Sequence, residues 1–340
     1  MYINEIVRIN YKCNWKCKFC NVLKTNNFWK DDISNKENIY NILKLSLKYS
    51  KHEMNNLILS FSWWEPTLNP HILRYIKLAK TLWIWNVQIQ TNWMKLYNNL
   101  SYTEDLINSW LDEIFLALHS NNDSINKQLG CQFFFSDFVK WTKYIKENKL
   151  QNKIKISLNI VVSKINIFNL TSLLNDLEVI WFFDILDASR EMWLLSKKMI
   201  SFWLVQPNGY AFNNKDELLL DFDANQLESI NQAVNLCERN WIMPDFHFTS
   251  PPLCIMDYKE YNLEYQRLKS LENDINNNLK NESNLETYKI LWSEKEKIQL
   301  CNGCLNQNYC LWFYKNWIDF VWMDYIKQRV LQYIEKQKFY

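Results

Sequence analysis

EIVRINYKCNWKCKFC, residues 5–20, joins a candidate β-strand to three closely spaced cysteines, Cys13, Cys17 and Cys20. Three thiolates on one loop can hold a four-iron cluster and leave one iron without a protein ligand, and catalytic metal sites keep such an open position. A structural zinc site is the alternative, but zinc needs a fourth ligand. No Cys or His occurs between Cys20 and His52. The stretch therefore favours an iron–sulfur cluster beside the first strand.

The residues that follow alternate short apolar runs with helical patterns, which predicts βα units and a parallel sheet. Between the first two predicted strands, Ser34 and Glu37 have the spacing of a capping box and predict a helix start. The fold class is therefore α/β. Six strands are predicted, at residues 5–11, 57–62, 86–91, 113–118, 153–162 and 182–187.

Composition and charge exclude several classes of protein. The chain has 340 residues, of which 48% are hydrophobic, and 39 basic and 37 acidic side chains give a net charge of +2. Such a balance gives no overall attraction to nucleic acid or anionic membranes. Eighteen apolar residues never follow one another, so a membrane span is not predicted. We expect a cytoplasmic protein that forms either one large domain or a domain with a smaller companion.

The other cysteines fall into a second group and three isolated positions. The second group is Cys301, Cys304 and Cys310, and its Cys-x2-Cys pair permits either an iron–sulfur cluster or a zinc site. Cys237 lies on an apolar stripe with Leu227, Ile230 and Val234, which predicts a helix that buries this thiol. Cys131 and Cys254 stand alone.

The segment from Cys13 to Cys20, with Phe19 before the last cysteine, resembles the signature of the radical S-adenosylmethionine (SAM) superfamily. This resemblance implies a partial (β/α)6 barrel, here residues 1–200. It also implies a 4Fe-4S cluster whose open iron binds SAM. Reductive cleavage of SAM would give a 5′-deoxyadenosyl radical that abstracts hydrogen from the substrate.

The resemblance extends to the ends of three further predicted strands. The family has Gly-Gly-Glu-Pro after its second strand, where this chain has Trp63, Trp64, Glu65 and Pro66. It often has Thr-Asn-Gly after the third strand, where this chain has Thr91, Asn92 and Trp93. Ser120 follows the fourth strand, where related enzymes place polar groups against SAM. The resemblance therefore implies cofactor contacts from Trp63, Trp64, Glu65, Pro66, Asn92 and Ser120.

The C-terminal cysteines resemble those of the SPASM and twitch domains, which bind auxiliary iron–sulfur clusters. The resemblance implies a connecting segment at 201–234 and an auxiliary domain at 235–340, with Cys254, Cys301, Cys304 and Cys310 as ligands. Tyr314 occupies the place of a further SPASM cysteine, so one cluster of the twitch type is expected. A four-cysteine zinc site stays open as the alternative.

Three functions remain possible from the sequence. The first is a radical SAM enzyme that acts on a peptide or a small precursor, with flavodoxin or ferredoxin as electron donor. The second is a cyclase like that of molybdenum-cofactor synthesis. The third is a non-catalytic iron–sulfur or zinc protein, because two tryptophan rings would crowd a place where backbone must approach the cofactor.

Glycine is scarce and tryptophan is abundant. At about 7% of residues, roughly 24 glycines are expected, whereas the chain has 3 glycines and 17 tryptophans. Some bacteria read the codon UGA as glycine, and a common variant code reads it as tryptophan. We therefore predict that many of these tryptophans are glycine in the cell, among them Trp63, Trp64, Trp83, Trp85, Trp93 and Trp110.

Overall fold

The computed structural model describes residues 3–20, 33–62, 64–187, 198–206 and 209–246. Short pieces follow at 295–296, 301–302, 304, 313–314, 328, 330–332 and 334–335.

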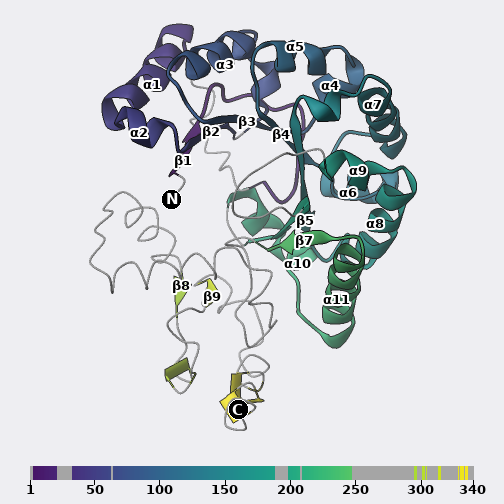
Figure 1. Cartoon of the computed structure of the whole chain (residues 1–340). Coiled ribbons are helices and arrows are strands. Elements are labelled where there is room, and N and C mark those ends of the chain that lie inside the picture. The colour runs from purple at the N-terminus through teal and green to yellow at the C-terminus, as the bar shows by residue number, and fades with distance from the viewer. Residues whose placement is uncertain are drawn as a thin grey trace.

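Seven parallel strands form one sheet in chain order, and helices cover its outer, convex side (Figure 1). Each strand pairs only with its sequence neighbours, from Ile3 opposite Leu57 to Ser201 opposite Asp245, so the sheet does not close in the described part of the chain. This confirms the α/β class and the open, partial barrel. The strands are β1 Ile3–Val7, β2 Leu57–Phe61, β3 Asn86–Thr91, β4 Glu113–Ala117, β5 Lys155–Val162, β6 Lys198–Leu204 and β7 Ile242–Asp245.

The prediction of a strand at 182–187 was wrong, because these residues form helix α9, Phe182–Asp187. Phe182, Ile185 and Leu186 are buried at the i, i+3, i+4 spacing of one helix face. A short apolar run suits either a helix or a strand, and here the helix contacts α8 and the strands β5 and β6. The sheet gains its sixth and seventh strands farther along, so it has seven strands rather than six.

The helices alternate with the strands as expected for βα units. Ser34 caps α1 by accepting a hydrogen bond from the Glu37 N–H at 3.1 Å, which confirms the predicted helix start. Cys237 is fully buried on α11, as its apolar stripe predicted. The helices are α1 Asn35–Lys48, α2 Lys51–Met54, α3 Ile72–Thr81, α4 Met94–Asn98, α5 Tyr102–Asn108, α6 Asp123–Leu129, α7 Phe135–Glu147, α8 Leu170–Val179, α9, α10 Lys215–Leu218 and α11 Ala224–Arg239.

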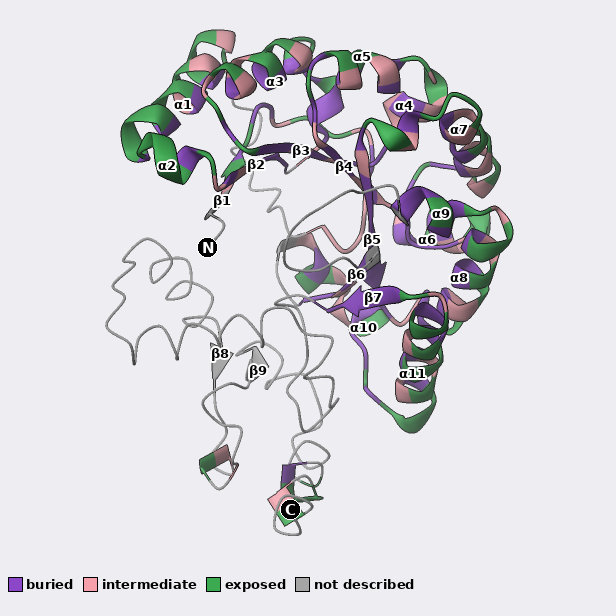
Figure 2. Ribbon diagram, in the orientation of Figure 1, coloured by how far each residue is buried: buried purple, intermediate pink, exposed green. Residues whose placement is uncertain are grey.

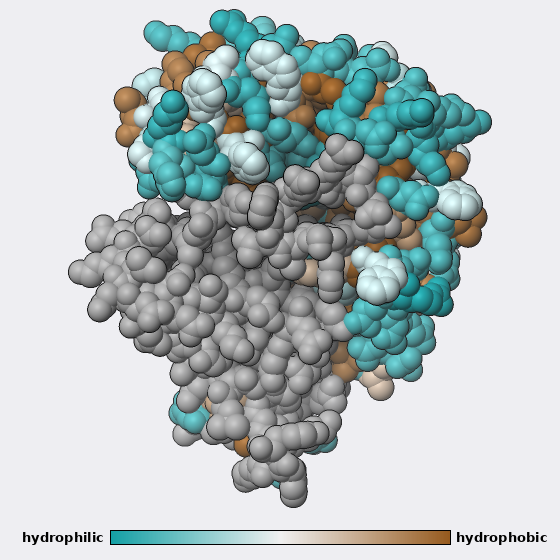
Figure 3. Space-filling view, viewed as in Figure 1, coloured by the Kyte–Doolittle hydropathy of each residue, from teal (hydrophilic) through white to brown (hydrophobic). Residues whose placement is uncertain are grey.

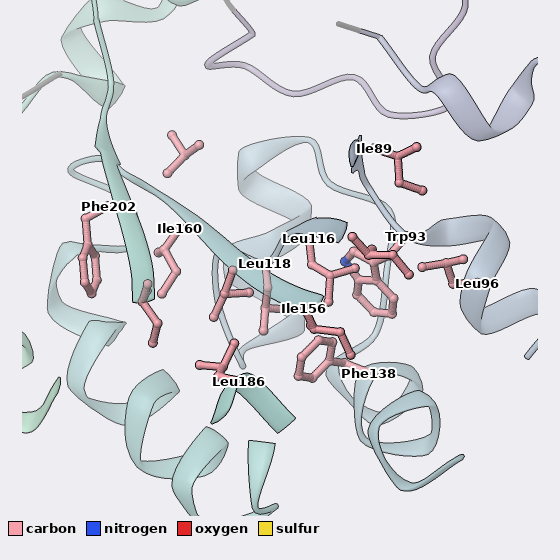
Figure 4. Close-up of a cluster of buried hydrophobic side chains, with 14 of the residues drawn as sticks. Ile89, Trp93, Leu96, Leu116, Leu118, Phe138, Ile156, Ile160, Leu186 and Phe202 are labelled. Carbon is pink, nitrogen blue, oxygen red and sulfur yellow. The ribbon is translucent and has the colours of Figure 1, made fainter. Parts of the chain in front are cut away.

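The core lies between the sheet and its helices. Strands and inner helix faces are buried while the outer helix faces are exposed (Figure 2). In the close-up, Leu116 and Ile156 from the neighbouring strands β4 and β5 lie near Phe138 of α7 (Figure 4). Burying apolar side chains contributes roughly 25 cal/mol per Å², so this layer stabilises the sheet and fixes the strand ends that carry the polar residues described below.

On the face shown in Figure 3, the coloured part of the surface is mostly hydrophilic, with scattered apolar side chains. Among the described residues no helix is both long and apolar enough to cross a membrane. The C-terminal part contributes one small antiparallel pair, β8 Lys295–Glu296 and β9 Phe313–Tyr314.

Candidate functional site

Polar residues follow β2, β3 and β4 at the same edge of the sheet. Glu65 comes four residues after β2, Asn92 directly after β3, and Ser120 three residues after β4. The carboxyl ends of parallel strands meet at one edge, which is where barrels of this type bind ligands. The loop with the three cysteines leaves β1 at this edge too.

Glu65 is completely buried, and its carboxylate joins the ends of β2 and β3. Its Oε1 atom accepts hydrogen bonds from the Thr67 N–H (2.9 Å), the Thr67 hydroxyl and the Thr91 hydroxyl (2.8 Å). Its Oε2 atom accepts the Asn92 N–H at 2.7 Å. Burial raises the pKa of Glu65 above its usual value, and these four donors act in the opposite direction. Glu65 therefore holds protein groups together with its carboxylate.

The backbone of Glu65 also fixes the cysteine loop. Its N–H donates to the Lys12 carbonyl at 3.0 Å, and its carbonyl accepts the Asn10 side-chain amide at 2.9 Å. Asn92 reaches the same loop from β3, because its Nδ2 donates to Asn14 Oδ1 at 2.6 Å and lies 3.9 Å from Cys13 Sγ. Glu65 and Asn92 thus place the first cysteine relative to two strand ends.

A second support for the loop comes from the end of α6, which the sequence did not reveal. The Gly130 carbonyl accepts the Lys16 N–H at 3.1 Å, and the Leu129 carbonyl accepts the Lys18 N–H at 2.9 Å. Gly130 has φ +81°, and a Cβ there would lie 2.2 Å from the Lys16 carbonyl oxygen. Only glycine permits this contact. The sequence offered one signal for this contact, because Gly130 is one of three glycines in the whole chain.

Cys131, which the sequence left isolated, lies beside this loop. Its sulfur is 3.9 Å from Cys17 Sγ and is buried. Cys13, Cys17 and Cys20 are all at least partly exposed. In the part of the chain that the structure describes, no three Cys, His, Asp or Glu side chains are arranged as a ready metal site. The cysteines would have to turn their thiols toward a shared cluster.

The chemistry of the three thiols fits an iron–sulfur cluster, since thiolates are its usual ligands. Cys13 is exposed as a residue, but its sulfur lies in a crowded part of the loop. This desolvation raises its pKa to about 12, against the opposing effect of the Trp15 N–H, and Cys17 and Cys20 raise it further. Binding iron at Cys13 would release a proton.

His119 and Ser120 lie beneath the loop. Trp15 and Phe19 both meet the His119 ring edge-on, with ring centroids 6.2 and 4.9 Å away. Its Nδ1 accepts the Val161 N–H at 3.1 Å, and burial lowers its pKa to about 3, so the ring is neutral at ordinary pH. The Ser120 hydroxyl is buried and accepts the Asn122 N–H at 2.9 Å.

The remaining predicted cofactor contacts lie on the segment after β2. Trp64 has φ 55°, and its ring meets that of Tyr11 at 5.0 Å. Pro66 is buried at the start of a short 3-10 helix, Pro66–Leu68. Trp63 lies outside the described residues.

Two of the four C-terminal cysteines can be placed. Cys301 and Cys304 share a turn in which the Cys304 N–H donates to the Cys301 carbonyl at 3.0 Å. Cys254 and Cys310 lie outside the described residues, as does most of the expected 235–340 domain.

An open parallel α/β sheet with three thiols beside its carboxyl edge defines the class of the domain. Residues 7–169 match the family model of the Radical SAM superfamily, so this part of the chain is a Radical SAM domain. No curated protein matches the sequence.

Solved radical SAM structures resemble the chain at low identity. SuiB of Streptococcus suis, bound to S-adenosylmethionine, is 16% identical with a TM-score of 0.49, over 76% of this chain and 53% of SuiB. The coproporphyrinogen III oxidase HemN of Escherichia coli is 11% identical with a TM-score of 0.48, over 70% and 53%. The chain thus spans about half the length of these proteins.

Proposed function

We propose that the protein is a radical SAM enzyme whose 4Fe-4S cluster is held by Cys13, Cys17 and Cys20. The observation that carries the proposal is the Radical SAM domain at 7–169, with all three thiols on a loop fixed to the strand ends. When bound, the cluster supplies the electron that cleaves SAM to a 5′-deoxyadenosyl radical, which abstracts hydrogen from the substrate.

The chain's own residues bind and orient in this proposal. Glu65 and Asn92 hold the loop against β2 and β3, and Gly130 holds it against α6. Trp15 and Phe19 of the loop pack against the neutral His119 ring beneath it. Trp64, Pro66, Asn92 and Ser120 border the space proposed for SAM, with Trp63 between β2 and Trp64 in the sequence.

We propose a peptide or a small precursor as substrate and a cytoplasmic flavodoxin or ferredoxin as electron donor. The domain at 235–340 would carry an auxiliary cluster on Cys254, Cys301, Cys304 and Cys310. Support for this part comes from the cysteine spacing and from the turn that brings Cys301 to Cys304.

The test uses the full chain, reconstituted anaerobically with iron and sulfide. We expect a thiolate-to-iron absorption band, and less iron in a Cys13→Ala/Cys17→Ala/Cys20→Ala variant. The matched control is Cys237→Ala, which removes a buried thiol from α11, away from the loop. Equal iron in the triple variant and the control would contradict the N-terminal site. Residual iron in the triple variant would support the auxiliary cluster, and stoichiometric zinc there would refute it.

A further inference from the structure

We infer that the working protein carries glycine, rather than the printed tryptophan, at 64, 83, 93, 110, 181 and 241. Eight described non-glycine residues have positive φ, and six of them are these tryptophans. The other two are Lys149 and Phe222. Positive φ occurs in a few per cent of non-glycine residues and is an outlier for a bulky side chain. Ten of the seventeen tryptophans are described, so the six are a majority of these.

Four of the six occupy the same place in the fold, the second residue after the last turn of a helix. Trp83 follows α3, Trp110 follows α5, Trp181 follows α8 and Trp241 follows α11. Their φ values lie between 59° and 68°. Helices commonly end with a left-handed residue at this place, and it is usually glycine.

The hydrogen bonds identify the helix ending. The Trp83 N–H donates to the Lys80 carbonyl at 3.0 Å, and the next N–H, of Ile84, reaches back to Ala79 at 3.4 Å. After α5, Trp110 donates to Ile107 at 2.9 Å and Leu111 to Leu106 at 3.2 Å. This pair of bonds is the Schellman motif.

Trp181 and Trp241 repeat the first bond of the motif, although the sequence alone did not single them out. Their N–H groups donate to Glu178 and Glu238, each at 2.9 Å. The left-handed backbone is therefore fixed by helix termination at all four places.

The four rings do little for the fold. Trp83, Trp110, Trp181 and Trp241 are exposed by 66%, 58%, 63% and 80%. Lys51 lies 5.2 Å over the Trp83 ring and Lys146 lies 5.1 Å over the Trp181 ring, which are weak contacts at exposed sites. Neither observation gives a reason for tryptophan at a position that strains it.

Trp141 has none of these features and serves as the contrast. It is buried inside α7, its φ is not positive, and its Nε1–H donates to the Thr103 hydroxyl at 3.1 Å. We assign it as a true tryptophan. Trp85, which the sequence also singled out, lacks a positive φ, so its backbone gives no argument for glycine.

Trp64 and Trp93 also have positive φ, at 55° and 51°. The Trp93 ring is fully buried beside Leu116 and Phe138 (Figure 4), so the four exposed positions carry the inference. We extend the inference to Trp64 and Trp93 because one codon read with the wrong meaning would place tryptophan at all six positions. Glycine at 64 would open the segment next to Glu65, and this consequence alone rests on the proposed function.

The direct test is the mass of tryptic peptides from the protein isolated from its native cells, together with the codons of its gene. We expect glycine masses and UGA codons at 83, 110, 181 and 241, and a tryptophan mass with UGG at 141. Tryptophan masses at the four positions would overturn the inference. The readout does not depend on catalysis, so it is separate from the test of the proposed function.

Stability gives a second test on the full-length chain. Changing Trp83, Trp110, Trp181 and Trp241 together to Gly should raise the Tm by roughly 5–10 °C, because the αL strain at each position is relieved. Trp85→Gly is the matched control, an exposed ring on a backbone without positive φ, and it should lower the Tm slightly. An unchanged or lower Tm of the fourfold variant would contradict the inference.

Discussion

Replacing Glu65 with Gln tests whether this buried carboxylate fixes the cysteine loop. Three of its four hydrogen bonds reach Oε1 and one, from the Asn92 N–H, reaches Oε2. A Gln side chain can keep its oxygen at the position of Oε1, but its amide NH2 then takes the position of Oε2 and faces the Asn92 N–H. A buried donor left without a partner costs about 1–3 kcal/mol, and the loss of charge-assisted bonds adds to this. We expect a total of about 2–4 kcal/mol.

The matched control is Glu113→Gln. Glu113 is also a buried carboxylate, held by the Ser157 hydroxyl and by Lys155 at 3.4 Å, but it begins β4 and so lies at the opposite edge of the sheet. Urea unfolding of both variants gives the free energies. Hydrogen exchange at the Asn92 amide should accelerate in Glu65→Gln and stay unchanged in Glu113→Gln.

Iron content after reconstitution provides the functional comparison. Asn92 passes the effect to the loop through Asn14, so Glu65→Gln should reconstitute less iron than Glu113→Gln at equal fractions folded. Equal iron content, or an Asn92 amide as protected as in the unchanged protein, would refute the role assigned to Glu65.

Two more predictions follow from the support around the loop. Gly130→Ala should destabilise the protein by more than about 2 kcal/mol and lower iron content, because its Cβ would meet the Lys16 carbonyl at 2.2 Å and its φ is +81°. An unchanged urea midpoint would contradict this. His119 has a folded-state pKa of about 3, below the ordinary value of 6.5, so stability is full above pH 6.5 and is lost as pH falls, by about 1.4 kcal/mol per pH unit. His119→Asn, which keeps an acceptor for the Val161 N–H, should flatten this dependence between pH 6 and 5, and parallel curves for the two proteins would exclude His119 as its source.

Local pattern was enough to find the first five strands, although β1 spans Ile3–Val7 and not the predicted 5–11. The run Leu57 to Leu59 and the alternation from Ile154 to Val162 depend on burial along a single strand, which the sequence displays directly. The run at 182–187 was assigned to the wrong element because six apolar-rich residues satisfy both periods. Packing decides between helix and strand here, because α9 lies against β5 and β6.

The site was predictable where its chemistry lies in one short motif. Spacing alone identified Cys13, Cys17 and Cys20 as a group. Glu65 joins two strand ends and Gly130 supports the cysteine loop. Both roles depend on contacts between residues 26 to 114 positions apart, from Glu65–Thr91 to Lys16–Gly130. Periodicity cannot display such distant contacts.

The backbone added information that composition could not. The counts of glycine and tryptophan suggested an exchange between them, but Trp181 and Trp241 were recognised only from their φ values after α8 and α11.

The most direct test of the central claim is formation of 5′-deoxyadenosine from SAM by the anaerobically reconstituted full chain with a reductant. It should be run on the printed chain and on a chain with glycine at 63, 64, 83, 93, 110, 181 and 241. We predict 5′-deoxyadenosine from the glycine form, and none after Cys13, Cys17 and Cys20 are changed together to Ala. No product from either form with its cluster fully loaded, or product that persists in the triple variant, would contradict the account.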